Sequence, residues 1–478
     1  MKRELSLLRF SSLLGLFCCT AAVSQAEVQT RFEAASGETV AAFQGQLQVP
    51  ENRNDPDSRL ISIEYVRFPA SGTKPGSPIV YLSGGPGGSG IETARYDRFP
   101  LFMAMREFGD VIALDQRGTG ASNQLPDCVS KLRVVDSQAY TDGAFVDLHR
   151  QAALECFEFW ENEQFDFRGY TTRQSALDLE DLRHHLGADK ISLWGISYGS
   201  HLSLAAIKLL GDRIDRVVLA SVEGLAQTVK MPARTDAYFS RLQAAVSADS
   251  QLAAVYPDIA GLMRRVHARL DEQPVLLTLD FENGIQAPYL LEARDLQMIA
   301  AAMISDPPSA LLLLSLYAEL DNGATSRLAS LLAQFHTPDE PITYRPMSLA
   351  MDIASGISQT RFEQVEAEAR TSLLAAYLNF PMPQFAGVVP ALDLGEEFRG
   401  PPVSDVPVLV LSGTLDGRTY PESQREAVAG LRNAQIVTVH NAGHNLFMSS
   451  DEVAERIASF MRDEPSATSE ITVDFNPQ

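Results

Sequence analysis

Cysteine is scarce in this chain, which limits the ways in which its fold can be cross-linked. Four cysteines occur among 478 residues: Cys18 and Cys19 near the start, and Cys128 and Cys156 further along. Cys128 and Cys156 lack the Cys-x-x-Cys spacing that is typical of zinc ligands, so we expect no metal site there. In an oxidising compartment two such cysteines are normally bridged, and we expect a disulfide between Cys128 and Cys156.

Basic residues and long apolar runs are also in short supply. Lysine and arginine number 39 against 61 aspartates and glutamates, which gives a net charge of −22 at pH 7. A negative surface repels nucleic acids and anionic membranes, so we expect neither as a partner. After the N-terminal segment no run is long and apolar enough to cross a bilayer, so we expect no membrane anchor.

Residues 1–26 have the three-part organisation of a secretory signal peptide. Basic residues come first, an apolar run follows over residues 13–22, and a small residue stands at Ala26. The apolar run is too short to span a membrane. Bulky Leu16 and Phe17 precede the two early cysteines, where a lipidation signal has small residues, which disfavours a lipoprotein. We therefore expect cleavage near Ala26 and an exported protein, either periplasmic or secreted.

Eight short runs have the composition of β-strands and are separated by helical patterns. The first two runs alternate between apolar and polar residues, as antiparallel strands with one exposed face do. The later runs are almost continuously apolar, as in parallel strands that helices cover on both faces. The runs are VAAFQGQLQVP, LISIEYVRFPA, SPIVYLSGG, DVIALDQRG, KISLWG, DRVVLASVEG, VPVLVLSG and AQIVTVHNAG. The sequence therefore predicts an α/β fold with a mostly parallel, doubly wound sheet.

The alternation of strands and helices stops after Gly224 and resumes near Val406. Long helical patterns fill the stretch between them. Because the sheet needs strands from both sides of this stretch, we expect a helical cap inserted into one sheet domain. The polar C-terminal tail either adds an edge strand or stays loose. The predicted division is a signal peptide (1–26), a first core part (27–226), the cap (227–399), a second core part (400–464) and the tail (465–478).

The segment WGISYGS, residues 194–200, matches the Gly-x-Ser-x-Gly pattern of a nucleophile elbow. A buried strand precedes it and a helix follows it, which is the context that such an elbow requires. The elbow strains the serine backbone, and side chains at Gly195 and Gly199 would collide with the neighbouring strand and helix. The sequence therefore predicts that Ser197 is a nucleophile at the carboxyl edge of the sheet.

A serine nucleophile needs a histidine base and an acid that orients the histidine. In sheets of this kind both follow the serine in the chain, each beyond the end of a strand. Asp416 follows the strand VPVLVLSG, and His444 follows AQIVTVH. Asp405 lies before its strand and His440 lies within one, so neither has the right place. We predict a triad of Ser197, Asp416 and His444.

The oxyanion that forms during nucleophilic attack needs backbone N–H donors. Tyr198, the residue after the nucleophile, supplies the first donor. The second is expected from the run LSGGPGGSG, residues 82–90, where glycines let the backbone approach a substrate, and we assign it to Gly85. This run lacks the lysine and the spacing of a phosphate-binding loop.

Several motifs together resemble the proline iminopeptidase and tripeptidyl aminopeptidase family of α/β-hydrolases. They are GGPGGSG, DQRGTGASN (115–123), GISYG, SGTLDGRTYP and NAGHN. They span nearly the whole chain after the signal peptide and occur in the family's order. The resemblance implies an α/β-hydrolase fold and a serine exopeptidase that acts on free peptide N-termini beneath a helical cap. It implies no metal and no organic cofactor.

The chain also departs from the family's pattern. Many prolyl members have histidine where Ser83 stands and tryptophan where Tyr198 stands, so both positions favour the tripeptidyl branch. We interpret Asp115 and Arg117 as braces of the oxyanion loop. Glu223, at the end of VVLASVEG, either holds a substrate ammonium or is a structural carboxylate.

These observations lead to a functional hypothesis with two alternatives. We expect an exported serine hydrolase, an aminopeptidase that releases one to three residues through an acyl-enzyme. One alternative is a carboxylesterase of the same fold that acts on small esters, and the other is a non-catalytic binding protein. Expected partners are peptide or small-molecule substrates, and the oligomeric state stays open.

Overall fold

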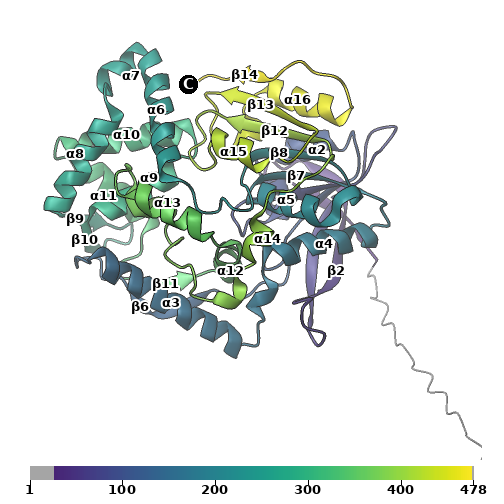
Figure 1. Ribbon diagram of the computed structural model, residues 1–478, viewed down its shortest axis with the longest axis horizontal. Helices are drawn as coiled ribbons and strands as arrows, with labels where there is room; N and C mark the ends of the chain where they lie inside the picture. Colours follow the sequence, from purple (N-terminus) through teal and green to yellow (C-terminus); the bar gives the residue numbers. More distant parts are fainter. Residues whose placement is uncertain (1–25, 476–478) are drawn as a thin grey trace, which may run out of the picture.

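A ten-stranded sheet forms the centre of the protein, whose structure is a computed structural model that describes residues 26–475 (Figure 1). The rest of the predicted signal peptide, residues 1–25, lies outside the described residues. From edge to edge the strands are β1 (Val28–Glu33), β2 (Thr39–Pro50), β3 (Leu60–Phe68), β5 (Val111–Leu114), β4 (Ile79–Leu82), β7 (Ile191–Ser197), β8 (Ile214–Val222), β12 (Val408–Gly413), β13 (Ala434–His440) and β14 (Glu470–Thr472).

Strand direction follows the pattern of apolar residues. β1, β2 and β3 are antiparallel, and β3 also pairs antiparallel with β5. From β5 to β14 every pair is parallel. Side chains of β2 and β3 alternate in burial, whereas those of β4, β5 and β12 are buried throughout. The predicted mostly parallel α/β sheet is confirmed, and the tail adds the edge strand β14.

Helices cover both faces of this sheet. An apolar core on one face includes residues of α4 (Thr172–His185), α5 (Tyr198–Leu210) and α15 (Pro421–Ala427). The core on the opposite face includes residues of α1 (Gly90–Arg95), α2 (Phe99–Met105) and α16 (Asp451–Met461). Among residues 26–475, no helix combines the length and the apolarity that crossing a bilayer would need.

The chain between β8 and β12 forms a mainly helical region, hereafter the cap, that lies beside the sheet (Figure 1). Its helices are α6 (Pro232–Ala248), α7 (Ser250–Val255), α8 (Ile259–Glu272), α9 (Ala293–Met303), α10 (Pro307–Asp321), α11 (Ser326–Phe335), α12 (Pro346–Ser355), α13 (Gln359–Ala369) and α14 (Gly395–Arg399). The cap also contains the single-turn helices η3 (Ala375–Asn379) and η4 (Pro390–Leu392). Outside the cap lie the single-turn helices η1 (Phe167–Gly169), η2 (Gly211–Arg213) and η5 (Leu446–Met448). The cap has an apolar core of its own.

Two small sheets were not predicted. In the cap, β9 (Val275–Asp280) pairs with β10 (Gln286–Leu291). β11 (Pro341–Tyr344) pairs with β6 (Cys128–Arg133), which belongs to the first core part. A disulfide joins Cys128 to Cys156 and so ties β6 to α3 (Asp142–Asn162). These strands are short and at most half buried, and β6, β10 and β11 lack the apolar runs that mark strands of the main sheet, whereas β9 (VLLTLD) has one.

Candidate active site

Ser197 stands at the sharp turn between β7 and α5 with φ 56° and ψ −128°, a strained conformation for a residue other than glycine. A β-carbon at Gly199 would lie 2.0 Å from the carbonyl oxygen of Leu82. One at Gly195 would lie 2.5 Å from the carbonyl oxygen of Gly199. Only glycine therefore fits at either position. The Ser197 hydroxyl does not cap its own helix and is available to a base.

Asp416 lies fully buried in the turn after β12 and binds His444, which follows β13. The His444 Nδ1 atom lies 3.0 Å from each carboxylate oxygen. The Thr419 hydroxyl donates to Asp416 Oδ2 at 2.6 Å, and its amide donates to Oδ1 at 2.8 Å. Burial alone would raise the pKa of Asp416, but His444 and the Thr419 donors outweigh it and lower the pKa. The carboxylate stays ionised and orients the ring so that Nε2 can act as a base.

The loop that carries His444 is tied to both the sheet and the cap. The His444 amide donates to the carbonyl oxygen of Ser305 at 2.8 Å, and its carbonyl oxygen accepts from the Ser221 hydroxyl at 2.7 Å. The next amide, of Asn445, donates to Asp306 Oδ1 at 3.1 Å. Ser221 belongs to β8, whose end pairs with the end of β7. His444 is therefore held at the sheet edge where the elbow lies.

The glycine-rich loop after β4 lies against the nucleophile. A β-carbon at Gly84 would lie 3.0 Å from Ser197 Cβ. Gly85, the predicted donor, has φ 126°, which only glycine adopts readily. From the cap, the Ser348 hydroxyl donates to the carbonyl oxygen of Pro86 at 2.6 Å. The loop therefore lies in close contact with Ser197.

The interpretation of Asp115 and Arg117 as braces of this loop is right for Asp115 and wrong for Arg117. Asp115 Oδ1 accepts from the Ser89 hydroxyl at 2.6 Å, at the end of the loop. Arg117 is fully buried, binds the carboxylate of Asp178 at 2.6 and 2.7 Å, and donates to the carbonyl oxygen of Gly169 at 2.6 Å. It reaches away from the loop because a buried guanidinium needs a carboxylate, and α4 supplies Asp178.

A cavity of about 490 Å³ lies beside the glycine-rich loop that follows β4. Gly85 of the oxyanion loop lines one side, and the cap lines others through α9 and residues 377–382. Four charged side chains share its wall. They are Glu223 and Lys230 from the segment after β8, Asp352 from α12, and Arg418 from the turn after β12. The cavity can therefore bind a small polar or charged group.

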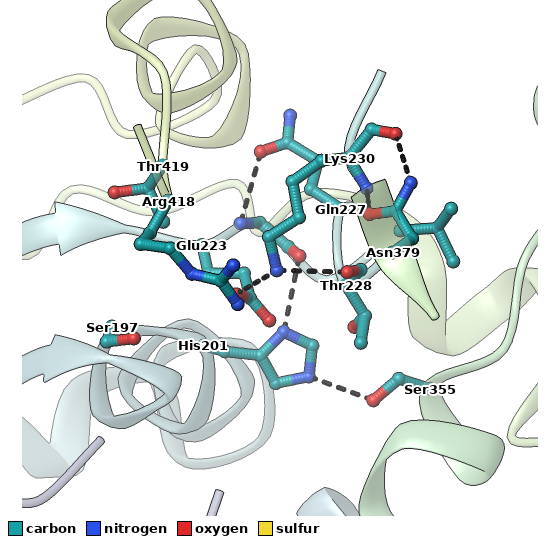
Figure 2. Close-up of polar contacts among 12 residues, drawn as sticks. Ser197, His201, Glu223, Gln227, Thr228, Lys230, Ser355, Asn379, Arg418 and Thr419 are labelled. Atoms are coloured by element: carbon teal, nitrogen blue, oxygen red, sulfur yellow. Dashed lines mark hydrogen bonds and ion pairs between the residues drawn. The ribbon is translucent and has the colours of Figure 1, made fainter. Parts of the chain in front are cut away.

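Glu223 is already paired within the protein (Figure 2). The Lys230 ammonium lies 3.1 Å from Glu223 Oε2 and donates to the carbonyl oxygen of Thr228 at 3.0 Å. Asn379 holds the Lys230 backbone through two hydrogen bonds, at 2.7 and 2.8 Å. Burial would raise the pKa of Glu223, but the charges of Lys230 and His201 lower it. Glu223 is therefore an ionised carboxylate with a fixed counter-ion.

Asp352 is the second carboxyl group of the cavity. Within residues 26–475 its side chain makes no hydrogen bond and no ion pair. Burial raises its pKa to about 7, and the charge of Glu223 adds to this effect, although Lys230 and Arg418 oppose it. Near neutral pH the group can therefore gain or lose a proton when a charged ligand binds.

Sequence analysis identified Glu223 but missed its three charged neighbours. Asp352 had a signal, because it is the single charged residue in the apolar helix PMSLAMDIAS, residues 346–355. An isolated carboxylate in such a helix needs a partner or a function. Arg418 stands in the motif SGTLDGRTYP, two residues after Asp416, but its contact with α9 depends on how the cap folds against the sheet. Lys230 had no such signal.

Two family models of known proteins match parts of the chain. A family model described as "alpha/beta hydrolase fold" matches residues 77–258, and one described as "TAP-like protein" matches residues 394–468. The serine protease Hip1 of Mycobacterium tuberculosis (strain ATCC 25618 / H37Rv) is 31% identical over 191 residues, 37% of this chain and 35% of that protein. The tripeptidyl aminopeptidase of Streptomyces lividans is 30% identical over 190 residues, also 37% and 35% of the two chains.

A probable proline iminopeptidase of Leptolyngbya boryana is 29% identical over 167 residues. The chain thus spans about a third of the length of the curated relatives that it matches. The first model covers the elbow and the oxyanion loop, and the second covers the turn of Asp416 and the loop of His444. These matches, and the sheet that carries them, show that the chain has the α/β-hydrolase fold.

Proposed function

We propose that the protein is a serine peptidase that releases one to three residues from free peptide N-termini. The observation that carries the proposal is that the wall of the cavity beside the glycine-rich loop contains the carboxyl groups of Glu223 and Asp352. The serine protease and tripeptidyl aminopeptidase relatives support a peptidase.

In the proposed mechanism, Ser197 attacks the substrate carbonyl and gives its proton to His444 Nε2. Asp416 stabilises the imidazolium that results, and the amides of Tyr198 and Gly85 bind the oxyanion. His444 then protonates the leaving amine and leaves an acyl group on Ser197. A water molecule, activated by the same histidine, hydrolyses this ester and restores the enzyme.

The proposed ligand of the substrate ammonium is Asp352, with Glu223 beside it. A buried ammonium needs a carboxylate, since its transfer from water is costly without one. Glu223 was the candidate from the sequence, but Lys230 already neutralises it. Asp352 has no partner within the described residues, so it is the better ligand. Glu223 then acts through its charge, which strengthens the hold of Asp352 on a proton or a cation.

The test compares a free-amine peptide, its N-acetylated form and a neutral ester. We expect acetylation to lower kcat/KM by about 30-fold or more, because it leaves a buried carboxylate unpaired. Asp352→Asn should lower kcat/KM for the free-amine peptide by a similar factor and leave the ester almost unchanged. The matched control is Asp236→Asn, which alters a half-buried cap carboxyl outside the cavity. Equal rates on free and acetylated peptides would favour the esterase alternative.

The same carboxyl group predicts a pH dependence. Burial and the charge of Glu223 raise the pKa of Asp352 to about 7, so the carboxylate is present above pH 7 and lost as the pH falls. We therefore expect KM for free-amine peptides to rise as the pH falls through about 7. Dividing peptide kcat/KM by ester kcat/KM removes the pH dependence that the two reactions share. In Asp352→Asn this ratio should no longer change near pH 7, and an unchanged profile would exclude Asp352.

A further inference from the structure

We propose that Arg418 forms an anion subsite that selects substrates with an acidic side chain among the residues released. The inference rests on the proposed function and deepens it. It starts from a cation in the cavity that the triad and the ammonium site leave unused.

The position of Arg418 is fixed from two sides. Its amide donates to Asp416 Oδ1 at 2.8 Å, which places the residue in the turn of the triad acid. Its Nη1 atom donates to the carbonyl oxygen of Ala301, on the cap helix α9, at 2.7 Å. The guanidinium lies in the cavity wall and points toward Glu223 (Figure 2). A planar group held in this way has little conformational freedom left to lose when a ligand binds.

Most N–H donors of the Arg418 guanidinium have no acceptor among the described residues. The group carries five N–H groups, and within residues 26–475 the bond to Ala301 is its one side-chain hydrogen bond. It forms no ion pair with any described carboxylate. Such a group binds a carboxylate through two parallel hydrogen bonds more strongly than it binds a neutral amide.

The charges in the cavity also favour an anion. Lys230 and Glu223 neutralise each other at 3.1 Å. When a substrate ammonium binds, it takes the charge of Asp352. Arg418 then remains as a cation without a counter-ion in a partly enclosed space, and an acidic substrate side chain would supply one.

The alternative is that Arg418 is purely structural and links α9 to the turn of the triad acid. The two roles differ in which substrates are affected. A structural role predicts that loss of Arg418 lowers activity on acidic and neutral peptides equally. An anion subsite predicts loss with acidic peptides alone.

The experiment uses three pairs of free-amine peptides, with glutamate or glutamine at the first, second or third residue. At one position the wild-type protein should prefer glutamate by at least about tenfold in kcat/KM, the size of one charged hydrogen bond. Arg418→Gln should bring the ratio at that position close to one, and Arg418→Lys should retain part of it. The control Arg241→Gln removes a nearby arginine, paired with Glu422 outside the cavity, and should keep the ratio.

The comparison of glutamate and glutamine peptides with the wild-type protein needs no variant and is the first test of the subsite. Equal kcat/KM for glutamate and glutamine at all three positions overturns the proposal, as does an equal loss for both peptides in Arg418→Gln. Esters with a succinyl group, which carries a carboxylate, or a butyryl group, which carries none, test the anion subsite independently of the proposed aminopeptidase activity. A succinyl preference that Arg418→Gln removes supports the subsite even if acetylated peptides react as fast as free ones, a result that would count against the aminopeptidase alone.

Discussion

Ser197→Ala is expected to lower kcat by about a millionfold on both peptides and esters, the loss typical of a serine nucleophile. Alanine can take the same position in the elbow, and the lost hydroxyl does not cap α5, so we expect the unfolding free energy to change by less than about 0.5 kcal/mol. Steady-state kinetics and thermal unfolding measure the two quantities. A serine-directed phosphonate should label the wild-type protein at Ser197 and fail to label the variant.

The matched control is Ser203→Ala, six residues after Ser197 in α5. The Ser203 hydroxyl donates to the carbonyl oxygen of Gly199 at 2.7 Å, within the same helix. Its loss should leave turnover within a fewfold of the wild-type value. If Ser197→Ala kept substantial activity, the nucleophile would have to be another residue, and the non-catalytic alternative would fail as well.

Asp416→Asn is expected to lower kcat by about ten-thousandfold, because it forces the wrong histidine tautomer. The amides of Arg418 and Thr419 both donate to Asp416 Oδ1, so the asparagine oxygen must take that place. Its NH₂ group then faces His444 Nδ1 and donates to it. The ring proton moves to Nε2, which can no longer accept the proton of Ser197.

The control for this variant is Asp405→Asn, which alters an exposed carboxylate paired with Arg432. It should keep full activity. The Asp416→Asn variant should still react with the phosphonate, but far more slowly than the wild-type protein does. Turnover within tenfold of wild type would show that Asp416 does not orient the base.

The sequence carries most of the information about the sheet and the triad for a physical reason. Strands buried on both faces must be apolar, and the elbow must have glycine at Gly195 and Gly199. Both constraints can therefore be recognised from the residue types in the sequence. Asp416 and His444 follow from them, since each stands just beyond a buried strand. In the structure, His444 Nδ1 lies 3.0 Å from Asp416 Oδ1.

The cavity is harder to predict because its walls come from distant parts of the chain. Glu223 lies at the end of β8 and could be identified from that strand. Its relation to Lys230, Asp352 and Arg418 depends on the fold of the cap, whose helices have no motif that fixes their position. The short strands β6, β10 and β11 were not predicted for a similar reason, since their pairing and not their composition makes them strands. β9 (VLLTLD) has the composition of a strand but stands alone among helical patterns in the sequence.

The hydrogen bonds that the His444 loop donates to Ser305 and Asp306 limit how the substrate selectivity of such proteins can change. The cap would define the substrate, yet these two residues also help to hold the base. A cap exchanged with that of a relative would shift the histidine unless this short segment were transferred unchanged. New selectivity is therefore more accessible through substitutions in the cavity wall than through replacement of the whole cap, and lineages that vary the rest of the cap should preserve this junction.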